Sequence, residues 1–431
     1  MIRAGLVEDA RRLVDAAATD DTGFRRLAHL CDRIGNRLSG SQSLDRAVRW
    51  SVDTLRADGF DRVSAEPVKV PHWVRGRESL RLLAPESRGI PMLGLGGSVG
   101  TSRRGLEAQV VVVRSFEELA ARGGEVRGRI VCYDVPFTTY GATVAYRSRG
   151  ASEAARLGAV AVLVRSVGPT SLSTPHTGSL SYADDAPKIP AAAIPLEDAM
   201  TLGRMAARGE SIRVRLAMEA KMLPDADSAN VVADLVGTER PEEIVLLGGH
   251  LDSWDVGAGA HDDGGGCVAA WEAVRLLKIL GMRPRRTVRI VLFTNEENGL
   301  RGATEYARRH RLEIPRHVLA IETDSGVAAP MGFGLSAKAS GGLGRAKAVL
   351  EPLLGLVGAG SITDGGGGAD VGPLGNAGTS TMGLSVDMSL YWSIHHTPAD
   401  TFDKVDRAAF GKCVAALAIV AKAAGDVEER W

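Results

Sequence analysis

Histidine and acidic residues follow four apolar stretches in the second half of the chain. His250-Leu251-Asp252 comes after the first stretch, Asn295-Glu296-Glu297 after the second and Glu322-Thr323-Asp324 after the third. His395-His396 follows the fourth, and His261-Asp262-Asp263 lies shortly after the first. Carboxylates and imidazoles gathered on one face would repel one another and lose solvation unless a cation neutralised them. We therefore predict a metal site.

The donor atoms indicate which metal the site would hold. Imidazole nitrogens and carboxylate oxygens without a thiolate fit Zn²⁺ in a catalytic rather than a structural site. His250 and His396 would each supply an imidazole. The carboxylates of Asp262, Glu297 and Asp324 could hold two ions if one of them bridges, since paired metals lie only about 3.5–4 Å apart. We expect two zinc ions per chain.

The segments that carry these residues alternate between strand and helix patterns. Strands are predicted at 244–249, 288–294, 318–322 and 379–386, and helices at 266–280, 300–310, 342–356 and 407–424. This alternation predicts an α/β fold, with a mostly parallel (mixed) sheet flanked by helices. Ligands collect at the carboxyl ends of strands in such sheets. The histidines and carboxylates should therefore meet at one edge.

Three parts are predicted along the chain. Residues 1–80 contain mainly helix over 6–60, residues 81–222 form an inserted domain without a cluster of metal or acid–base residues, and residues 223–431 carry the metal site. Leu223 to Asp227 is expected to be the linker that leaves the insert. The insert rejoins the core shortly before the His250 strand, so we expect it to act as a lid over the metal cleft.

Composition excludes several classes of protein. The 431 residues include 52 Lys+Arg and 52 Asp+Glu, which argues against binding to nucleic acid or to a membrane surface. No apolar run reaches the ~18 residues of a membrane span. Glu8-Asp9 interrupts the region where a signal peptide would be apolar, so we expect a cytoplasmic protein or a form whose leader was removed. The four cysteines are isolated and are expected to be buried thiols.

Four motifs resemble those of a known enzyme family. They are Gly249–Gly257, Gly259–Gly266, Thr294–Gly299 and His395–Thr401. Together they resemble the dizinc exopeptidases, which include bacterial aminopeptidases and glutamate carboxypeptidases. The likeness is strongest to the carboxypeptidase Q branch of that family.

The resemblance extends into the insert and covers nearly the whole chain. It is carried there by Pro71–Gly76, Tyr146–Gly150, Ser173–Gly178 and Lys188–Pro190. By this likeness the insert would be a protease-associated-like lid domain. Relatives in the family are homodimers, so the resemblance also implies a homodimer.

The resemblance assigns the metal ligands. The residue matching Asp262 bridges two zinc ions in such enzymes, and those matching His250, Asp324, Glu297 and His396 complete the two sites. His396 rather than His395 matches, because the ligand directly precedes a Ser/Thr and then an Asp-Thr pair.

The resemblance also assigns catalytic roles. Glu296 matches the general base, and Asp252 matches the carboxylate that orients the His250 ring. His395 stands where related aminopeptidases carry a tyrosine that stabilises the tetrahedral oxyanion. The peptide bond between Asp262 and Asp263 is cis in this family. His261 departs from the family pattern; it could make an extra polar contact or be a surface histidine without a role, and we expect the second.

These features predict a dizinc metallo-exopeptidase whose substrates are dipeptides or short peptides. One alternative is a dizinc amidohydrolase that acts on N-acyl or amidated substrates. Another is a non-catalytic relative of the fold, against which the complete set of ligands argues. A Ser-His-Asp hydrolase is poorly supported, since no Gly-x-Ser-x-Gly turn lies between a strand and a helix.

Overall fold

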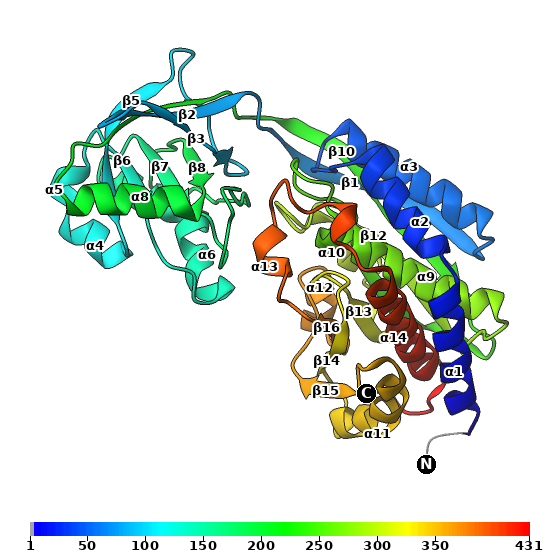
Figure 1. Ribbon diagram of the computed structural model, residues 1–431. Coiled ribbons are helices and arrows are strands. Elements are labelled where there is room, and N and C mark those ends of the chain that lie inside the picture. Colours follow the sequence, from blue (N-terminus) through cyan, green and yellow to red (C-terminus); the bar gives the residue numbers. More distant parts are fainter. Residues whose placement is uncertain (1–3) are drawn as a thin grey trace. The chain divides into compact units, whose positions relative to one another are not determined.

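The computed structural model describes residues 4–431, which divide into two compact units (Figure 1). The first unit contains the residues up to Val70, together with Asp225–Tyr391 and Asp400–Trp431. The second unit contains Pro71–Pro224 and Trp392–Ala399. The predicted insert, 81–222, lies within the second unit. That unit also takes in a short segment from the C-terminal part of the chain.

The first unit is built on an eight-stranded mixed sheet. Its strand order is β1-β10-β12-β11-β13-β16-β14-β15. Strands β12, β11, β13 and β16 are parallel, whereas β10 pairs with β12 and β14 pairs with β16 in the antiparallel sense. The strands span Arg62–Val74 (β1), Lys221–Leu235 (β10), Arg240–His250 (β11), Arg286–Phe293 (β12), His317–Glu322 (β13), Pro330–Ser336 (β14), Ser361–Asp364 (β15) and Thr381–Val386 (β16).

Helices cover both faces of this sheet, as predicted. The main ones are α1 (Ala4–Thr19), α2 (Thr22–His29), α3 (Gln42–Ala57), α9 (Gly265–Ile279), α10 (Arg301–Arg309), α11 (Gly342–Leu354) and α14 (Arg407–Asp426). Alternate residues of β11 pack on opposite faces. Val245 and Leu247 join the large core with α9 and α14, while Ile244 and Leu246 join a smaller core with Tyr306 of α10.

Helix α14 is long and apolar enough to cross a membrane by length and composition alone. However, 83% of its apolar window is buried inside the fold. It packs beside α1 and α9 in the core of the first unit (Figure 1), so its composition is that of a central core helix. The four cysteines, including Cys413 of this helix, are buried and free, as predicted.

The second unit has its own eight-stranded sheet, in the order β3-β2-β9-β5-β6-β7-β8-β4. Its strands are β2 (Glu78–Ala84), β3 (Arg88–Ile90), β4 (Leu93–Gly94), β5 (Leu106–Val113), β6 (Ile130–Tyr133), β7 (Ala161–Arg165), β8 (Ala191–Ile194) and β9 (Arg213–Met218). Helices α4 (Phe116–Ala121), α5 (Gly123–Val126), α6 (Tyr140–Ser148), α7 (Gly150–Arg156) and α8 (Leu196–Ala207) complete it.

The predicted exit at Leu223–Asp227 has the right position, because the chain passes from the second unit to the first between Pro224 and Asp225, but the expected irregular linker is wrong. These residues lie inside β10, a strand of 15 residues whose second half is buried. The first half of β10 is mostly exposed, so its proline and aspartates contact solvent. An exposed strand can carry these residues, which are also common in loops. Their polarity reflects exposure rather than irregular structure.

Candidate metal centre

The register of three parallel strands brings the predicted residues to one edge of the sheet. His250, the last residue of β11, pairs with Phe293, the last residue of β12. Glu322, the last residue of β13, pairs with Gly248. The turns that follow these strand ends carry the acidic residues. His250 and the carboxylates beyond β12 and β13 therefore converge, as the alternation of elements predicted.

The His250 ring lies among three carboxylates. Its Nε2 atom is 3.2 Å from Oδ1 of Asp262, 3.3 Å from Oδ1 of Asp324 and 3.9 Å from Oε2 of Glu296. Ligand atoms of His250, Asp262 and Asp324 all lie within 4.8 Å of one another. One imidazole nitrogen and several carboxylate oxygens at these separations form a donor set that fits a divalent cation such as zinc.

The charges around this ring also favour a cation. Burial opposes protonation of His250, yet its contacts with Asp262 and Asp324 raise the pKa of this imidazole well above its usual value. Burial, and then repulsion from carboxylates such as Asp324 and Glu297, raises the pKa of Glu296 well above its usual value. A bound divalent ion would offset this excess of negative charge.

Asp262 lies in the short segment η2 (Ala260–Gly264), in which Asp262 and Asp263 have non-helical backbone angles. The carboxylate of Asp400 accepts the backbone N–H of His261 at 2.8 Å and that of Asp262 at 3.1 Å. The peptide bond between Asp262 and Asp263 is cis, as the resemblance implied. These two hydrogen bonds fix the backbone from which the Asp262 carboxylate projects.

Asp263, to which the sequence analysis gave no role, connects the end of β11 to the start of α9. Its carboxylate accepts the backbone N–H groups of His250 and Gly266, each at 3.1 Å. A Cβ atom at Gly249 would lie 2.0 Å from this carboxylate, and one at Gly266 would lie 2.2 Å from it. The glycines of the two motifs therefore allow Asp263 to pack against the backbone.

Asp252 makes different contacts with its carboxylate and its carbonyl. The carboxylate accepts the backbone N–H of Glu296 at 3.0 Å and that of Glu297 at 3.3 Å. The Nδ1 atom of His250 lies 3.0 Å from the carbonyl oxygen of Asp252, and 3.9 Å from its carboxylate. In this structure the carbonyl makes the orienting contact with His250, and the carboxylate holds the two glutamates.

Arg37 is a buried residue that sequence reasoning missed. Its Nε donates to the carbonyl of Leu251 at 2.7 Å, and its Nη1 donates to the carbonyls of Ala258 at 2.7 Å and Gly35 at 2.8 Å. Its Nη2 donates to the carbonyl of Gly259 at 3.0 Å. One guanidinium thus fixes the loop between His250 and η2. The only sequence signal was its place in a polar loop between two helices.

Asn295 and Ser39 support the turn that carries Glu296. Asn295 adopts a left-handed backbone conformation, with φ of 68°, and its Nδ2 donates to Oγ of Ser39 at 3.0 Å. Its Oδ1 accepts the backbone N–H of Arg301, the first residue of α10, at 3.2 Å. The side-chain amide therefore stabilises a backbone conformation that is uncommon outside glycine.

Tyr391 is a further buried residue near the carboxylates. Burial, followed by the negative charges of Asp262, Asp324 and Glu297, raises the pKa of Tyr391 well above its usual value. The phenol therefore keeps its proton at neutral pH. Sequence reasoning missed it because a tyrosine in an apolar segment is ordinarily a core residue.

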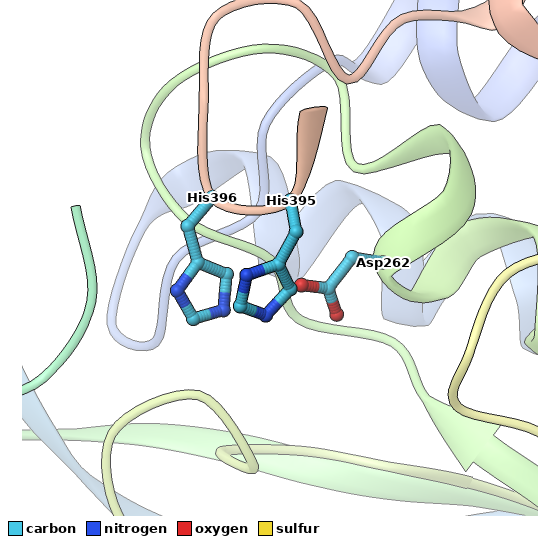
Figure 2. A group of neighbouring side chains, drawn as sticks. All are labelled: Asp262, His395 and His396. Carbon is cyan, nitrogen blue, oxygen red and sulfur yellow. The ribbon is translucent and has the colours of Figure 1, made fainter. Parts of the chain in front are cut away.

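His395 and His396, whose rings are drawn in Figure 2, belong to the second unit. Their rings stack with centroids 3.6 Å apart. The ring of His395 meets those of Tyr140 and Trp392 edge-on, at 5.4 Å and 5.2 Å. Both histidines are buried.

His261 is not a surface residue, so that expectation is wrong. Its side chain is buried, and its Nδ1 accepts the backbone N–H of Val327 at 3.3 Å. Its Nε2 lies 3.1 Å from the carbonyl oxygen of Lys404, to which it donates. Burial lowers the pKa of this imidazole. His261 is a neutral core histidine with both ring nitrogens bonded.

Comparison with known proteins identifies the family. Residues 230–421 match the family model described as peptidase family M28. The chain is 45% identical to carboxypeptidase Q of Xenopus laevis over 426 residues, which cover 97% of this chain and 90% of that protein. This chain belongs to peptidase family M28. It is also 44% identical to carboxypeptidase Q of Homo sapiens, over 94% of this chain and 86% of that protein.

Solved structures of this family agree. A peptidase M28 precursor from Shewanella amazonensis is 33% identical, with a TM-score of 0.95 and coverage of 99% of this chain and 98% of that one. A zinc aminopeptidase from Bacillus subtilis shares the fold, with a TM-score of 0.68 at 20% identity and coverage of 92% and 93%. The mixed α/β fold and the membership of a family of zinc-dependent exopeptidases are confirmed. The chain is a metallo-exopeptidase.

Proposed function

We propose that this M28 metallo-exopeptidase binds two zinc ions and hydrolyses dipeptides or short peptides. The observation that carries the proposal is the position of the His250 Nε2 atom, within 3.9 Å of three carboxylates. When bound, zinc would polarise the scissile carbonyl and lower the pKa of a bound water. Asp262 is the bridging ligand in this proposal.

His250, Asp324, Glu297 and His396 complete the proposed ligand set. The assignment of His396 rests on its place in the motif His395–Thr401, directly before Thr397 and the pair Asp400-Thr401.

Glu296 is the proposed general base. Its backbone N–H is fixed by Asp252, and its side chain is 21% exposed, so it can contact both water and substrate. Glu296 would take a proton from the attacking water and pass it to the leaving amine. Glu297 is the more buried of the pair, which suits a ligand rather than a proton carrier.

The proposal includes a substrate with a free amino terminus, a feature that the acetylated dipeptide in the test below lacks. A homodimer, a lid role for the insert and a cytoplasmic location remain predictions from the sequence.

The test compares four substrates with the zinc-loaded protein: a free dipeptide, its N-acetyl form, its C-terminal amide and a folded protein. We expect rapid release of amino acids from the free dipeptide and no internal cleavage of the protein. Release of acetate from the acetylated dipeptide would instead indicate a dizinc amidohydrolase. No hydrolysis of any substrate would indicate a non-catalytic relative.

A further inference from the structure

Two motifs of the insert have no part in the proposed chemistry, yet both contact the histidine loop, defined here as Trp392–Ala399. The motifs are Tyr146–Gly150 and Ser173–Gly178. The histidine loop and both motifs belong to the second unit. Contacts within this unit therefore show what the insert does for His396.

Thr177 contacts His396 through both of its backbone groups. The Thr177 N–H donates to the carbonyl of His396 at 2.9 Å. The Thr177 carbonyl lies 3.3 Å from Nδ1 of His396. A carbonyl can only accept, so this 3.3 Å contact favours the tautomer with the proton on Nδ1, which leaves the lone pair of Nε2 for a metal.

The backbone of His396 needs such support. Its φ is +59°, in the left-handed region that residues other than glycine rarely adopt. A conformation of this kind persists only where the surrounding structure enforces it. The hydrogen bond from Thr177 N–H to the carbonyl of His396 supplies one such constraint.

Arg147 fixes the Thr177 carbonyl in turn. Its guanidinium is buried, and Nη1 donates to the Thr177 carbonyl oxygen at 3.4 Å. The same Nη1 lies 3.5 Å from Nδ1 of His396; because Nη1 can only donate, that longer contact is no hydrogen bond when Nδ1 carries the proton. Its Nη2 donates to the hydroxyl of Tyr140 at 2.8 Å. A Cβ atom on Gly178 would lie 2.4 Å from the guanidinium carbon, so only glycine there leaves room for Arg147.

Other contacts seat the rest of the histidine loop on the insert. The rings of Tyr140 and Trp392 stack at 4.8 Å, and the hydroxyls of Thr170 and Ser393 lie 3.0 Å apart. A Cβ atom on Gly168 would lie 2.7 Å from the carbonyl oxygen of Trp392. The loop is thus packed against the insert along its first half.

We propose that Arg147 and the Thr177 carbonyl are positioning residues that hold the His396 ring in the tautomer and orientation required for metal binding. The insert then acts as part of the metal centre, because it supplies the outer partner of one ligand. This inference rests on the proposed function, in which His396 binds zinc.

The test measures zinc affinity by competition of the metal-free protein with a chelator. Removal of an outer partner of a metal-bound histidine typically weakens binding by about 10–100-fold. We expect Arg147→Met to weaken one of the two zinc sites by this factor and to leave the other unchanged. Arg147→Lys should restore part of the affinity, and Gly178→Ala should weaken the same site.

Arg149→Met is the matched control. Arg149 lies in the same motif but is exposed, with its guanidinium 5.0 Å from the centre of the Phe116 ring. This variant should bind both ions as the wild type does. Wild-type affinity at both sites in Arg147→Met, or an equal loss in Arg149→Met, would overturn the proposal.

Hydrogen exchange of the metal-free protein tests the positioning role without zinc, so failure of this proposal can be told apart from failure of the proposed function. Arg147→Met should speed exchange of the Thr177 N–H and of the histidine loop, while exchange in the cores of both units stays unchanged. Unchanged exchange at Thr177 would count against the positioning role. Absence of zinc binding in the wild type would instead contradict the proposed function alone.

Discussion

The backbone N–H of Glu296 donates to the carboxylate of Asp252 at 3.0 Å, and the neighbouring N–H of Glu297 donates to the same carboxylate at 3.3 Å. One buried side chain therefore fixes two adjacent glutamates. The Glu296 side chain is 21% exposed whereas Glu297 is buried, so the two carboxylates have separate surroundings. This arrangement suits a base and a ligand that are adjacent in sequence.

Asp252→Asn should lower kcat without unfolding the protein. The amide keeps the size of the side chain but has one acceptor oxygen for two N–H donors, and its own NH₂ group would face one of them. We expect kcat to fall by about 10–100-fold, the usual effect of changing such a supporting residue. Steady-state kinetics and metal analysis of the same sample check this. A wild-type kcat would show that the carboxylate does not position the glutamates.

Substituting the two glutamates one at a time should separate their roles. Glu296→Gln removes the proposed base, so we expect it to keep both metals and to lose about 10²-fold or more in kcat. Glu297→Gln removes a proposed ligand and should lose metal first. Metal analysis and kcat are measured on both variants. If Glu296→Gln turns over at nearly the wild-type rate, Glu296 is not the base.

His395 is predicted to donate a hydrogen bond to the developing oxyanion. His395→Phe preserves the stacking on His396 and the edge-on contacts with Tyr140 and Trp392 but removes both ring nitrogens. Loss of such a donor costs about 2.7–4 kcal/mol in transition-state stabilisation. We expect kcat to fall by the corresponding factor while the metal content is kept. His395→Ala, which also loses the stacking, is the companion variant.

An unchanged kcat in His395→Phe, together with a reduced rate in His395→Ala, would assign this histidine a packing role only.

His317 should make stability depend on pH below neutrality. Burial, with the nearby Arg289 cation adding to it, lowers the pKa of His317 from 6.5 to about 4. The unfolded chain binds a proton here below pH 6.5, whereas the folded chain does so only near pH 4. The stability from this neutral histidine is therefore complete above pH 6.5. It falls by about 3 kcal/mol as the pH drops to 4.

His317→Gln tests this dependence. The Nε2 atom of His317 lies 3.0 Å from the hydroxyl of Tyr306, and a glutamine can retain a polar contact there without titrating. Between pH 7.5 and 4, the urea midpoint of the wild type should fall more steeply than that of the variant, because only the wild type titrates at this position. Parallel midpoints over this range would contradict the role of His317.

The strands and their carboxyl ends were predictable from the sequence. Apolar runs that end in His250 or Asn295 have a length and a pattern that local physics determines. The parallel pairing of β11 with β12 and β13 then places His250, Glu296 and Asp324 at one edge. Residue type and strand order together were sufficient for this part of the candidate site.

The supporting contacts were not predictable in the same way. Arg37 is separated from Leu251 by more than 200 residues, and its donors bond only to backbone carbonyls, which leave no trace in the sequence. His261 seemed to be a surface residue because polarity is a poor guide to burial when backbone groups satisfy both nitrogens. Thr177 acts through its backbone, so its residue type carries no signal of that role.

The zinc content per chain tests the central claim most directly. Metal-free protein is reconstituted with excess zinc, unbound metal is removed, and zinc is measured by mass spectrometry alongside hydrolysis of a free dipeptide. We predict two zinc ions per chain, with hydrolysis lost after chelation and regained with zinc. One ion or none per chain, or hydrolysis that persists in the metal-free protein, would contradict a dizinc exopeptidase.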